Sequence, residues 1–473
     1  MPESRGSSAS RRRPPVVACY AALAGLAVAT PTRASPPADA AVQIDRAVAE
    51  EMAKAREPAV SIAVVRNGRL FYVKAYGHAR LDPPVGVTSS QPFAVGSVTK
   101  QFVAAAVLLL AEQGKLSLDD KVGRWLPGLT ASDRITIRQL LSHTAGYRDY
   151  WPQDYVMDFM MKPTTPDAIL DRWAKAPLDF QPGDEWQYSN TGYVAAGRII
   201  EKASGQPLNA FLAQNIFKPL GMTSVQFVDQ TAAPVGGPQG YTRYGMGPER
   251  PAPLEGANWI WGCGHLAMTP EDLAKWDEAM INGKLLTPAS WRAMETSVRL
   301  NNLRDAGYGL GVGATSDGAF RMIEHDGSIS GFLAENRVWP DVGQAVIVLT
   351  NTDRGDPSAI ADRIAKILAL ASAPGDAQTA RARAFFEALQ AGRLARGQLT
   401  PTANAFFDPT VTGDYIKSLA GLGSITSFKG TGLVIRGGFT REIYEVKLAK
   451  GQVRVIARAA ADRYEEFQIF PLE

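Results

Sequence analysis

Residues 97–113 limit the possible folds of this chain more than any other stretch, because nearly every position in it is apolar or small. Gly114 follows directly and is a typical helix stop. A helix that is apolar almost all round must be covered on every side, so it belongs inside a folded domain. The chain has 473 residues, of which 45% are hydrophobic, and is long enough to build such a core and more than one domain.

Strand-like patterns lie on either side of a helical middle region, which spans about residues 115–300. Two β-rich runs flank Asn67-Gly68, a pair that favours a tight hairpin turn. Strand signals that return after the helical region indicate one α/β domain closed by segments far apart in sequence, and we place it at residues 41–370. The strand-like runs are residues 60–65, 70–73, 337–339 and 344–349, and a last helix covers about residues 357–370.

A second, smaller domain is expected at the C-terminal end. Residues 371–375 read Ala-Ser-Ala-Pro-Gly, which is typical of a linker. A helical pattern over residues 378–391 follows, and the remainder alternates between apolar and polar residues as strands do. We predict a small α+β domain at residues 376–473. It would either cap an active site or provide a dimer surface, and the pattern fixes neither this role nor the oligomeric state.

Residues 1–40 have the organisation of a secretory signal peptide. Arg11, Arg12 and Arg13 precede an apolar run over residues 16–29, and small residues follow it. The run is shorter than the roughly 20 apolar residues that a membrane-spanning helix needs. We therefore predict export with cleavage, a periplasmic or secreted location, and no stable membrane span after cleavage. The cleavage site is left open.

Charge and cysteine content exclude several classes of function for the processed chain. Removing residues 1–40 takes five of the 50 basic and two of the 47 acidic residues, which leaves 45 of each. A near-neutral chain does not indicate a nucleic-acid-binding surface. Cys263 is then the only cysteine, which rules out an intramolecular disulfide. His78 and His265 have no acidic partner at a metal-ligand spacing and the chain has no H-E-x-x-H motif, so we expect no metal and no cofactor.

Ser97 and Lys100 stand three positions apart at the start of the apolar helix, so both side chains lie on one helical face within reach of each other. A serine is a good nucleophile only when a neighbour takes its proton. Burial lowers the pKa of a lysine because an apolar surrounding disfavours its charged form. The helix start also presents backbone N–H groups to a developing oxyanion. In the simpler alternative, Ser97 caps the helix and Lys100 extends to solvent, which is the usual meaning of S-x-x-K.

Two further elements follow in the chain. Tyr188 and Asn190 lie two positions apart in an extended segment, so a phenol and an amide point the same way. His325-Asp326-Gly327 comes later. With Ser97-Val98-Thr99-Lys100, these elements resemble the serine β-lactamase and penicillin-binding-protein superfamily, in its class C-like branch of esterases, D-aminopeptidases and DD-carboxypeptidases. The resemblance covers roughly residues 45–370 and is carried also by residues 140–146, 262–273, 308–311 and 348–351.

The resemblance implies a fold class and a role for several residues. The fold would be α/β, with a β-lactamase/DD-peptidase-like antiparallel sheet flanked by helices, a helical subdomain and the small C-terminal α+β domain. Ser97 would be the acylated nucleophile, Lys100 its proton acceptor, and Tyr188 the group that passes the proton to the leaving group and later activates water. Which of Lys100 and Tyr188 is the formal base is left open. Asn190 would hold Lys100 and a substrate carbonyl, and the backbone N–H groups of Ser97 and Ser328 would form the oxyanion hole.

The chain differs from the β-lactamases of this superfamily at the third element, where those enzymes carry Lys-Thr-Gly and this chain has His325-Asp326-Gly327. A lysine is charged at neutral pH whereas a histidine is mostly neutral, so the attraction for substrate carboxylates is weakened. On a strand, His325 and Asp326 would face opposite sides, which excludes a catalytic His-Asp dyad. We expect His325 to face the substrate, Gly327 to leave room for its close approach, and Ser328 to direct its N–H at the oxyanion.

These observations predict an enzyme, a serine hydrolase that needs neither metal nor cofactor and forms an acyl-enzyme on Ser97. Its substrates would be small esters, first of all, or D-amino-acid amides and peptides. A DD-peptidase or β-lactamase that acts on peptidoglycan-type or β-lactam substrates is an alternative, favoured by the exported location. Another alternative is a non-catalytic ligand-binding sensor, although such a protein needs no paired nucleophile and base. The sequence does not determine the identity of the substrate.

Overall fold

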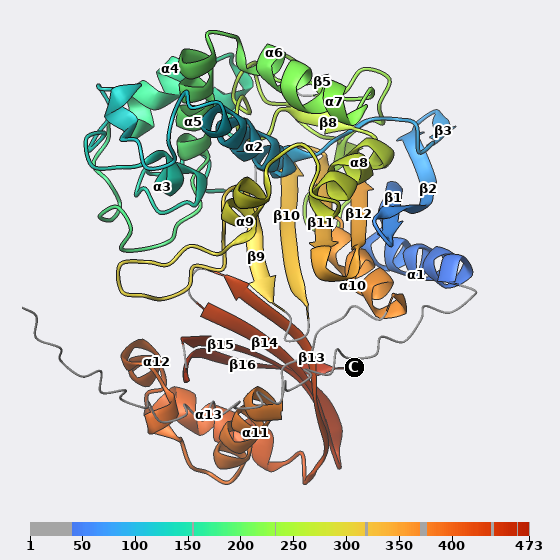
Figure 1. Ribbon diagram of the computed structural model, residues 1–473. Coiled ribbons are helices and arrows are strands. Elements are labelled where there is room, and N and C mark those ends of the chain that lie inside the picture. The colour runs from blue at the N-terminus through green and yellow to red at the C-terminus, as the bar shows by residue number, and fades with distance from the viewer. Residues whose placement is uncertain are drawn as a thin grey trace, which may run out of the picture. The chain divides into compact units, whose positions relative to one another are not determined.

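The computed structural model describes residues 40–472, with gaps at 154–155, 232, 317–319, 369–375, 437–438 and 461 (Figure 1). The expected signal peptide, up to residue 39, and the expected linker at 371–375 lie outside the described residues. Within the part of the chain that is described, no helix is both long and apolar enough to cross a membrane.

A seven-stranded antiparallel sheet forms the framework of the larger domain. Its central strand β12 pairs with β1 from the other end of the domain, so that Thr350 lies opposite Val60. Segments far apart in the sequence thus close the domain, as predicted. In spatial order the strands are β3 (Pro84–Gly86), β2 (Arg69–Leu81), β1 (Ala59–Arg66), β12 (Gln344–Thr350), β11 (Phe332–Trp339), β10 (Arg321–Ile329) and β9 (Gly313–Ser316).

The predicted hairpin turn connects β1 and β2. Asn67 and Gly68 have φ angles of 53° and 68°, in the left-handed region that asparagine and glycine tolerate best. β2 extends well beyond the predicted strand-like run at 70–73. Much of this strand is partly or fully exposed and carries polar residues. An apolar pattern therefore reveals only its first part.

Helices cover both faces of this sheet (Figure 1). On one face, α1 (Ala40–Ala55) and α10 (Pro357–Ile367) pack with Val60 and Ile62 of β1. Ala63, which points the other way, belongs to the larger core on the opposite face. Because both faces are covered, β1 has no polar side, and apart from Ser61 its sequence is apolar up to Arg66 rather than alternating.

The apolar stretch forms α2 (Thr99–Glu112), which follows a short 3₁₀ turn at Gly96–Val98. Every residue from Thr99 to Leu108 is buried, so the prediction of a covered helix is confirmed. α2 lies against α5 (Asn190–Ser204) from the helical middle of the chain. Ser97 itself lies in the turn before the helix.

The remaining elements of the larger domain are short. A small three-stranded sheet holds the segment before Ser97, since Phe93 in β4 pairs with Met268 in β8. Its strands are β4 (Phe93–Ala94), β8 (Leu266–Met268) and β5 (Gln226–Phe227), and β6 (Tyr241–Thr242) pairs with β7 (Arg250–Pro251). The helices are α3 (Ile137–Leu141), α4 (Pro166–Ile169), α6 (Leu208–Leu212), α7 (Lys218–Leu220), α8 (Pro270–Ile281) and α9 (Pro288–Glu295).

The C-terminal part folds around a hydrophobic core of its own. Phe385, Phe386 and Leu389, which the helical pattern placed on one side, are all fully buried against the sheet. The α+β character of this small domain is thereby confirmed, whereas its exact boundaries remain a prediction. Helices α11 (Asp376–Gln390), α12 (Pro401–Phe406) and α13 (Pro409–Ala420) precede an antiparallel sheet of β13 (Ile425–Arg436), β14 (Phe439–Leu448), β15 (Gly451–Ala460) and β16 (Arg463–Leu472) in sequential order.

Candidate active site

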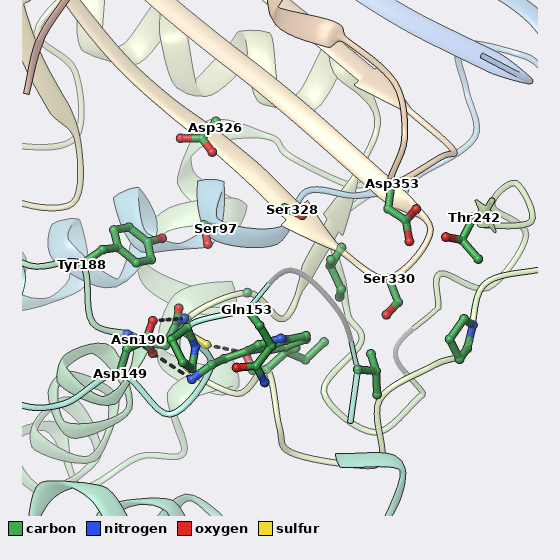
Figure 2. A pocket seen from close by; sticks show the side chains of 18 of the residues that line it. Ser97, Asp149, Gln153, Tyr188, Asn190, Thr242, Asp326, Ser328, Ser330 and Asp353 are labelled. Carbon is green, nitrogen blue, oxygen red and sulfur yellow. Dashed lines mark hydrogen bonds between the residues drawn. The ribbon is translucent and has the colours of Figure 1, made fainter. Parts of the chain in front are cut away.

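A pocket of about 700 Å³ lies beside the start of α2 and contains Ser97 (Figure 2). Its walls come from segments that are far apart in the chain. One part of the wall is formed by four segments: the turn before α2, the loop around residue 150, the segment before α5 and strand β10. Another part is formed by residues 353–354. The labelled lining residues are Ser97, Asp149, Gln153, Tyr188, Asn190, Thr242, Asp326, Ser328, Ser330 and Asp353.

The turn that carries Ser97 is pressed closely against strand β10. Gly96 has a φ of +49°, and a Cβ atom at this position would lie only 2.9 Å from the backbone nitrogen of Ser328. A Cβ atom at Gly327 would lie 2.1 Å from the carbonyl oxygen of Val95. Two glycines thus permit backbone-to-backbone contact, and this contact brings the Ser328 nitrogen next to the turn with Ser97.

Strand β10 is at the edge of the sheet where it passes this turn. β9 pairs only with residues 321–324, so residues 325–329 have a strand neighbour, β11, on one side alone. The other side of the backbone faces residues 95–96. The strand is therefore able to offer an N–H group to a ligand in the pocket instead of to another strand.

Lys100 is completely buried and binds three oxygen acceptors. Its Nζ lies 3.0 Å from Ser97 Oγ, 2.8 Å from Asn190 Oδ1 and 2.9 Å from the Cys263 carbonyl oxygen. Burial lowers the pKa of Lys100 to about 8, although the partial and full charges of Cys263, Asp149 and Asp326 oppose this shift. A neutral Lys100 can donate to Asn190 and Cys263 while its lone pair accepts the proton of Ser97.

Asn190 is held by Asp149, a residue that the sequence analysis did not single out. The Asn190 backbone nitrogen and Nδ2 donate to the two Asp149 carboxylate oxygens at 3.1 and 3.3 Å. This pairing turns Asn190 Oδ1 toward Lys100. Burial raises the pKa of Asp149, while hydrogen bonds from Trp151 and Asn190 and the charge of Lys100 act in the opposite direction.

Tyr188 lies beside both Ser97 and Lys100. Its ring centre is 4.8 Å from Lys100 Nζ, and its hydroxyl shares a hydrogen bond with Ser97. Burial raises the pKa of Tyr188 well above its usual value, and Tyr308 and Asp326 add to this effect, while the bond to Ser97 opposes it. Tyr188 is therefore a neutral hydrogen-bond donor near pH 7, whereas Lys100 is close to its midpoint.

The family profile described as Beta-lactamase matches residues 44–371, about two thirds of the chain. This chain belongs to the β-lactamase family. Over 308 residues it is 31% identical to "Penicillin-binding protein 4*" of Bacillus subtilis (strain 168), a match that covers 62% of this chain and 68% of that protein. The family members that this chain resembles are serine hydrolases. We therefore assign the chain to the serine hydrolases.

Two solved structures are similar to this chain over most of its length. The D-amino acid amidase from Ochrobactrum anthropi SV3, complexed with L-phenylalanine amide, is 25% identical with a TM-score of 0.61, and the match covers 70% of this chain and 99% of the amidase. The octameric penicillin-binding protein homologue from Pyrococcus abyssi is 22% identical with a TM-score of 0.61, and covers 92% of this chain and 96% of its own. The latter likeness concerns the fold alone.

The structure corrects two expectations for the segment that replaces Lys-Thr-Gly of the family's β-lactamases. His325 does not face the substrate: its side chain is 3% exposed and points away from the pocket, with Nε2 2.8 Å from the Tyr308 hydroxyl. Gly327 does not leave room for a substrate, because the Val95 backbone fills that space. Along β10, burial alternates, and Asp326 and Ser328 are the exposed, pocket-lining residues.

His325 Nδ1 lies 2.5 Å from the backbone carbonyl oxygen of Asp326 rather than from its carboxylate. A carbonyl can only accept, so Nδ1 carries a proton, and in the neutral tautomer with that proton Nε2 accepts from the Tyr308 hydroxyl. The opposite orientation of His325 and Asp326 agrees with the exclusion of a His-Asp dyad. His325 supports the site from behind, since its ring centre is 6.2 Å from that of Tyr188.

His143 and His265 are buried and have structural roles. His143 Nδ1 accepts from the Ser189 backbone nitrogen at 3.1 Å, and its ring packs 4.3 Å from Tyr188. His265 is fully buried next to Asn209, and burial lowers its pKa to about 4. Among the residues that are described, no three or more His, Cys, Asp or Glu side chains converge as they would around a metal ion.

Sequence reasoning missed Asp149 and Tyr308. Asp149 stands between aromatic residues in a loop without periodicity, and only folding brings it to Asn190. Tyr308 belongs to one of the stretches that carried the family resemblance, so that stretch contained a usable signal. Nothing in that stretch indicated that the Tyr308 hydroxyl would form a hydrogen bond with His325.

Proposed function

We propose that this chain is an exported hydrolase that cleaves small esters or D-amino-acid amides and peptides through an acyl-enzyme on Ser97. The observation that carries the proposal is the 3.0 Å contact between Ser97 Oγ and a buried Lys100 whose partners are all neutral acceptors. A lysine in these surroundings loses its proton readily, and a serine beside it gains a base.

In the proposed acylation step, neutral Lys100 takes the proton of Ser97 as Oγ attacks the substrate carbonyl. The backbone N–H groups of Ser97 and Ser328 stabilise the oxyanion. Tyr188, which holds its proton at neutral pH because of burial, delivers a proton to the leaving group. In deacylation, the deprotonated Tyr188 takes a proton from the attacking water, the bond between Oγ and the acyl carbon breaks, and Lys100 returns its proton to Ser97 Oγ. Asn190 keeps Lys100 oriented and binds a substrate carbonyl.

The proposed substrate classes rest on the proteins that this chain resembles. Likeness to the D-amino acid amidase supports amide substrates. Likeness to penicillin-binding protein 4* supports the second candidate, a DD-peptidase or β-lactamase. Nitrocefin turnover together with stable labelling by a fluorescent penicillin would favour this second candidate, whereas ester or amide turnover without either result favours the first.

The proposal is tested by covalent labelling and by turnover. We expect the full chain to form a fluorophosphonate adduct, located on Ser97 by mass spectrometry, and to hydrolyse a chromogenic short-chain ester. Ser97→Ala should lose both, whereas Ser330→Ala, which removes another hydroxyl of the same pocket, should still be labelled. A wild-type chain that forms no adduct would instead support the ligand-binding sensor.

Export is proposed on the signal-peptide pattern of residues 1–40. N-terminal sequencing of chain recovered from a Gram-negative expression host tests it. We expect a processed N-terminus between residues 34 and 41 in the periplasm or medium. Full-length chain found only in the cytosol would contradict it.

A further inference from the structure

His143 has an uncommon backbone conformation in the loop that follows α3. Its φ angle is +59°, in the left-handed region that glycine and asparagine adopt far more readily than histidine. Its side chain is 1% exposed. A residue other than glycine keeps such a conformation only where the surrounding structure holds it there, so the contacts that His143 makes show what the conformation achieves.

Two hydrogen bonds connect His143 to the residues on either side of Tyr188. Its carbonyl oxygen accepts from the Gln187 backbone nitrogen at 3.0 Å, and its Nδ1 accepts from the Ser189 backbone nitrogen at 3.1 Å. Ser189 is extended, and its side chain caps α5 by accepting from the Gly192 nitrogen at 3.3 Å. The backbone around Tyr188 is thereby fixed to His143 on both sides and to α5 at one end.

The loop that contains His143 also binds the adjoining parts of this segment. The Gly183 nitrogen donates to the Thr144 carbonyl oxygen at 2.8 Å, and the Asn190 nitrogen donates to the Asp149 carboxylate at 3.1 Å. The loop therefore runs beside the segment over its whole length, and His143 binds the part of it that carries the phenol.

The imidazole ring of His143 also packs against the phenol ring of Tyr188. The two ring centres are 4.3 Å apart, and the ring planes are tilted by 33°. Tyr308 and Tyr193 pack on the same imidazole, with ring centres at 4.8 and 5.2 Å. In Figure 2 the Tyr188 hydroxyl points toward Ser97, with which it shares a hydrogen bond. These contacts of His143 involve the ring and the neighbouring backbone of Tyr188, whereas the hydroxyl lies at Ser97.

We propose that His143 is a positioning residue, which holds the Tyr188 hydroxyl at the reacting atoms through its two hydrogen bonds to the backbone. This role presupposes the proposed hydrolase function, in which Tyr188 gives its proton to the leaving group. A displacement of the hydroxyl by about 1 Å would slow this proton transfer by on the order of 10²-fold. Lys100 would keep its contact with Ser97, because none of its three hydrogen bonds involves His143.

Two acetate esters test this proposal, because they differ in how much the leaving group needs a proton. 4-Nitrophenyl acetate releases an acidic phenol that leaves as an anion, whereas benzyl acetate releases an alcohol that must be protonated as it leaves. Acetic acid release by the full chain is followed at constant pH, and the readout is kcat/KM for 4-nitrophenyl acetate divided by kcat/KM for benzyl acetate. This leaving-group ratio does not depend on how much of a variant is folded. Tyr188→Phe, which keeps the ring, gives the ratio for complete loss of the proton.

His143→Ala removes the Nδ1 acceptor and should raise the leaving-group ratio by on the order of 10²-fold. If this variant does not fold, His143→Gly, which suits the left-handed backbone, takes its place. His143→Asn also suits this backbone and keeps an acceptor near the position of Nδ1, so its ratio should stay close to that of the wild type. Adding His143→Ala to Tyr188→Phe should raise the ratio no further.

His265→Ala is the matched control. His265 is 0% exposed, and its Nδ1 also accepts from a backbone nitrogen, that of Gly262 at 3.1 Å, but it lies in another loop. Its replacement should lower kcat/KM for both esters alike, if at all, and leave the leaving-group ratio unchanged.

An unchanged ratio in His143→Ala, or an equal rise in His143→Ala and His265→Ala, would overturn the positioning role and leave the hydrolase intact. An equal rise in His143→Ala and His143→Asn would overturn the role of the hydrogen bonds. A further rise when His143→Ala is added to Tyr188→Phe would show that His143 does not act through Tyr188. Turnover of 4-nitrophenyl acetate alone by the wild type would also overturn the role, since no proton would reach the leaving group. Turnover of neither ester, together with absence of a fluorophosphonate adduct, would overturn the hydrolase itself.

Discussion

Lys100 is a fully buried and Arg337 a largely buried basic residue of the same domain, but their partners differ in kind. Lys100 meets three neutral acceptors, and its pKa is lowered to about 8. Arg337 lies 2.7 Å from Glu335 and 2.5 Å from Asp362, and these carboxylates hold its pKa above the usual value against the effect of burial. A cation paired with carboxylates stays charged and stabilises the fold, whereas one surrounded by neutral acceptors is ready to exchange a proton.

The largest effect that this comparison predicts is on catalysis. Lys100→Met removes the proposed proton acceptor while keeping a long side chain, and kcat/KM for a chromogenic ester should fall about 10³- to 10⁴-fold. Lys115→Met, an exposed position just after α2, is the matched control and should have near wild-type activity. A Lys100→Met variant that keeps a tenth of the activity would show that Lys100 is not the acceptor.

Arg337 should behave in the opposite way and affect stability. Arg337→Met leaves the buried carboxylate of Glu335 without its ion-pair partner, which costs on the order of 3 kcal/mol in the free energy of unfolding. Urea denaturation followed by circular dichroism measures this loss. Exposed Arg69→Met should change it by less than about 0.5 kcal/mol. If Arg337→Met unfolds at the wild-type urea concentration, the ion pair is not stabilising.

The dependence of kcat/KM on pH should report the pKa of Lys100. The reaction needs neutral Lys100, so kcat/KM should rise with pH through a midpoint at about 8 and gain roughly tenfold between pH 7 and 9. Spontaneous hydrolysis is subtracted at each pH, and circular dichroism checks that the fold persists. A profile that is flat across this window would mean that the lysine is already neutral at pH 7 or takes no part.

The smallest effect concerns Asp149, whose charge raises the pKa of Lys100. Asp149→Asn keeps an acceptor for Asn190 but removes the charge, so the midpoint of the kcat/KM profile should move to lower pH, with a severalfold change in rate. Asp119→Asn, an exposed carboxylate paired with Arg138, should leave the midpoint in place. A shift in the upward direction would contradict the electrostatic role of Asp149.

Much of the fold could be predicted because local patterns carry it. The apolar run of α2, the Asn67-Gly68 turn and the apolar side of α11 each depend on neighbours in sequence, and all three were confirmed. The extent of β2 was not predictable, since a strand that lies partly in solvent has little apolar pattern. The nearness of Ser97 and Lys100 was predictable for the same local reason, because helical geometry sets it.

The sequence by itself determined which chemical groups are available: a serine and a lysine one turn apart, a phenol and an amide two positions apart, and a buried helix to carry the first pair. Alternation along β10 also followed from the sequence, so His325 and Asp326 had to face opposite sides. Only the tertiary structure decided which of the two faces the pocket. That choice depends on Tyr308 on one side of the strand and on the Val95–Gly96 backbone at its edge. The Val95–Gly96 contact joins segments far apart in the chain, and the Tyr308–His325 contact spans 17 residues, so neither follows from a local pattern.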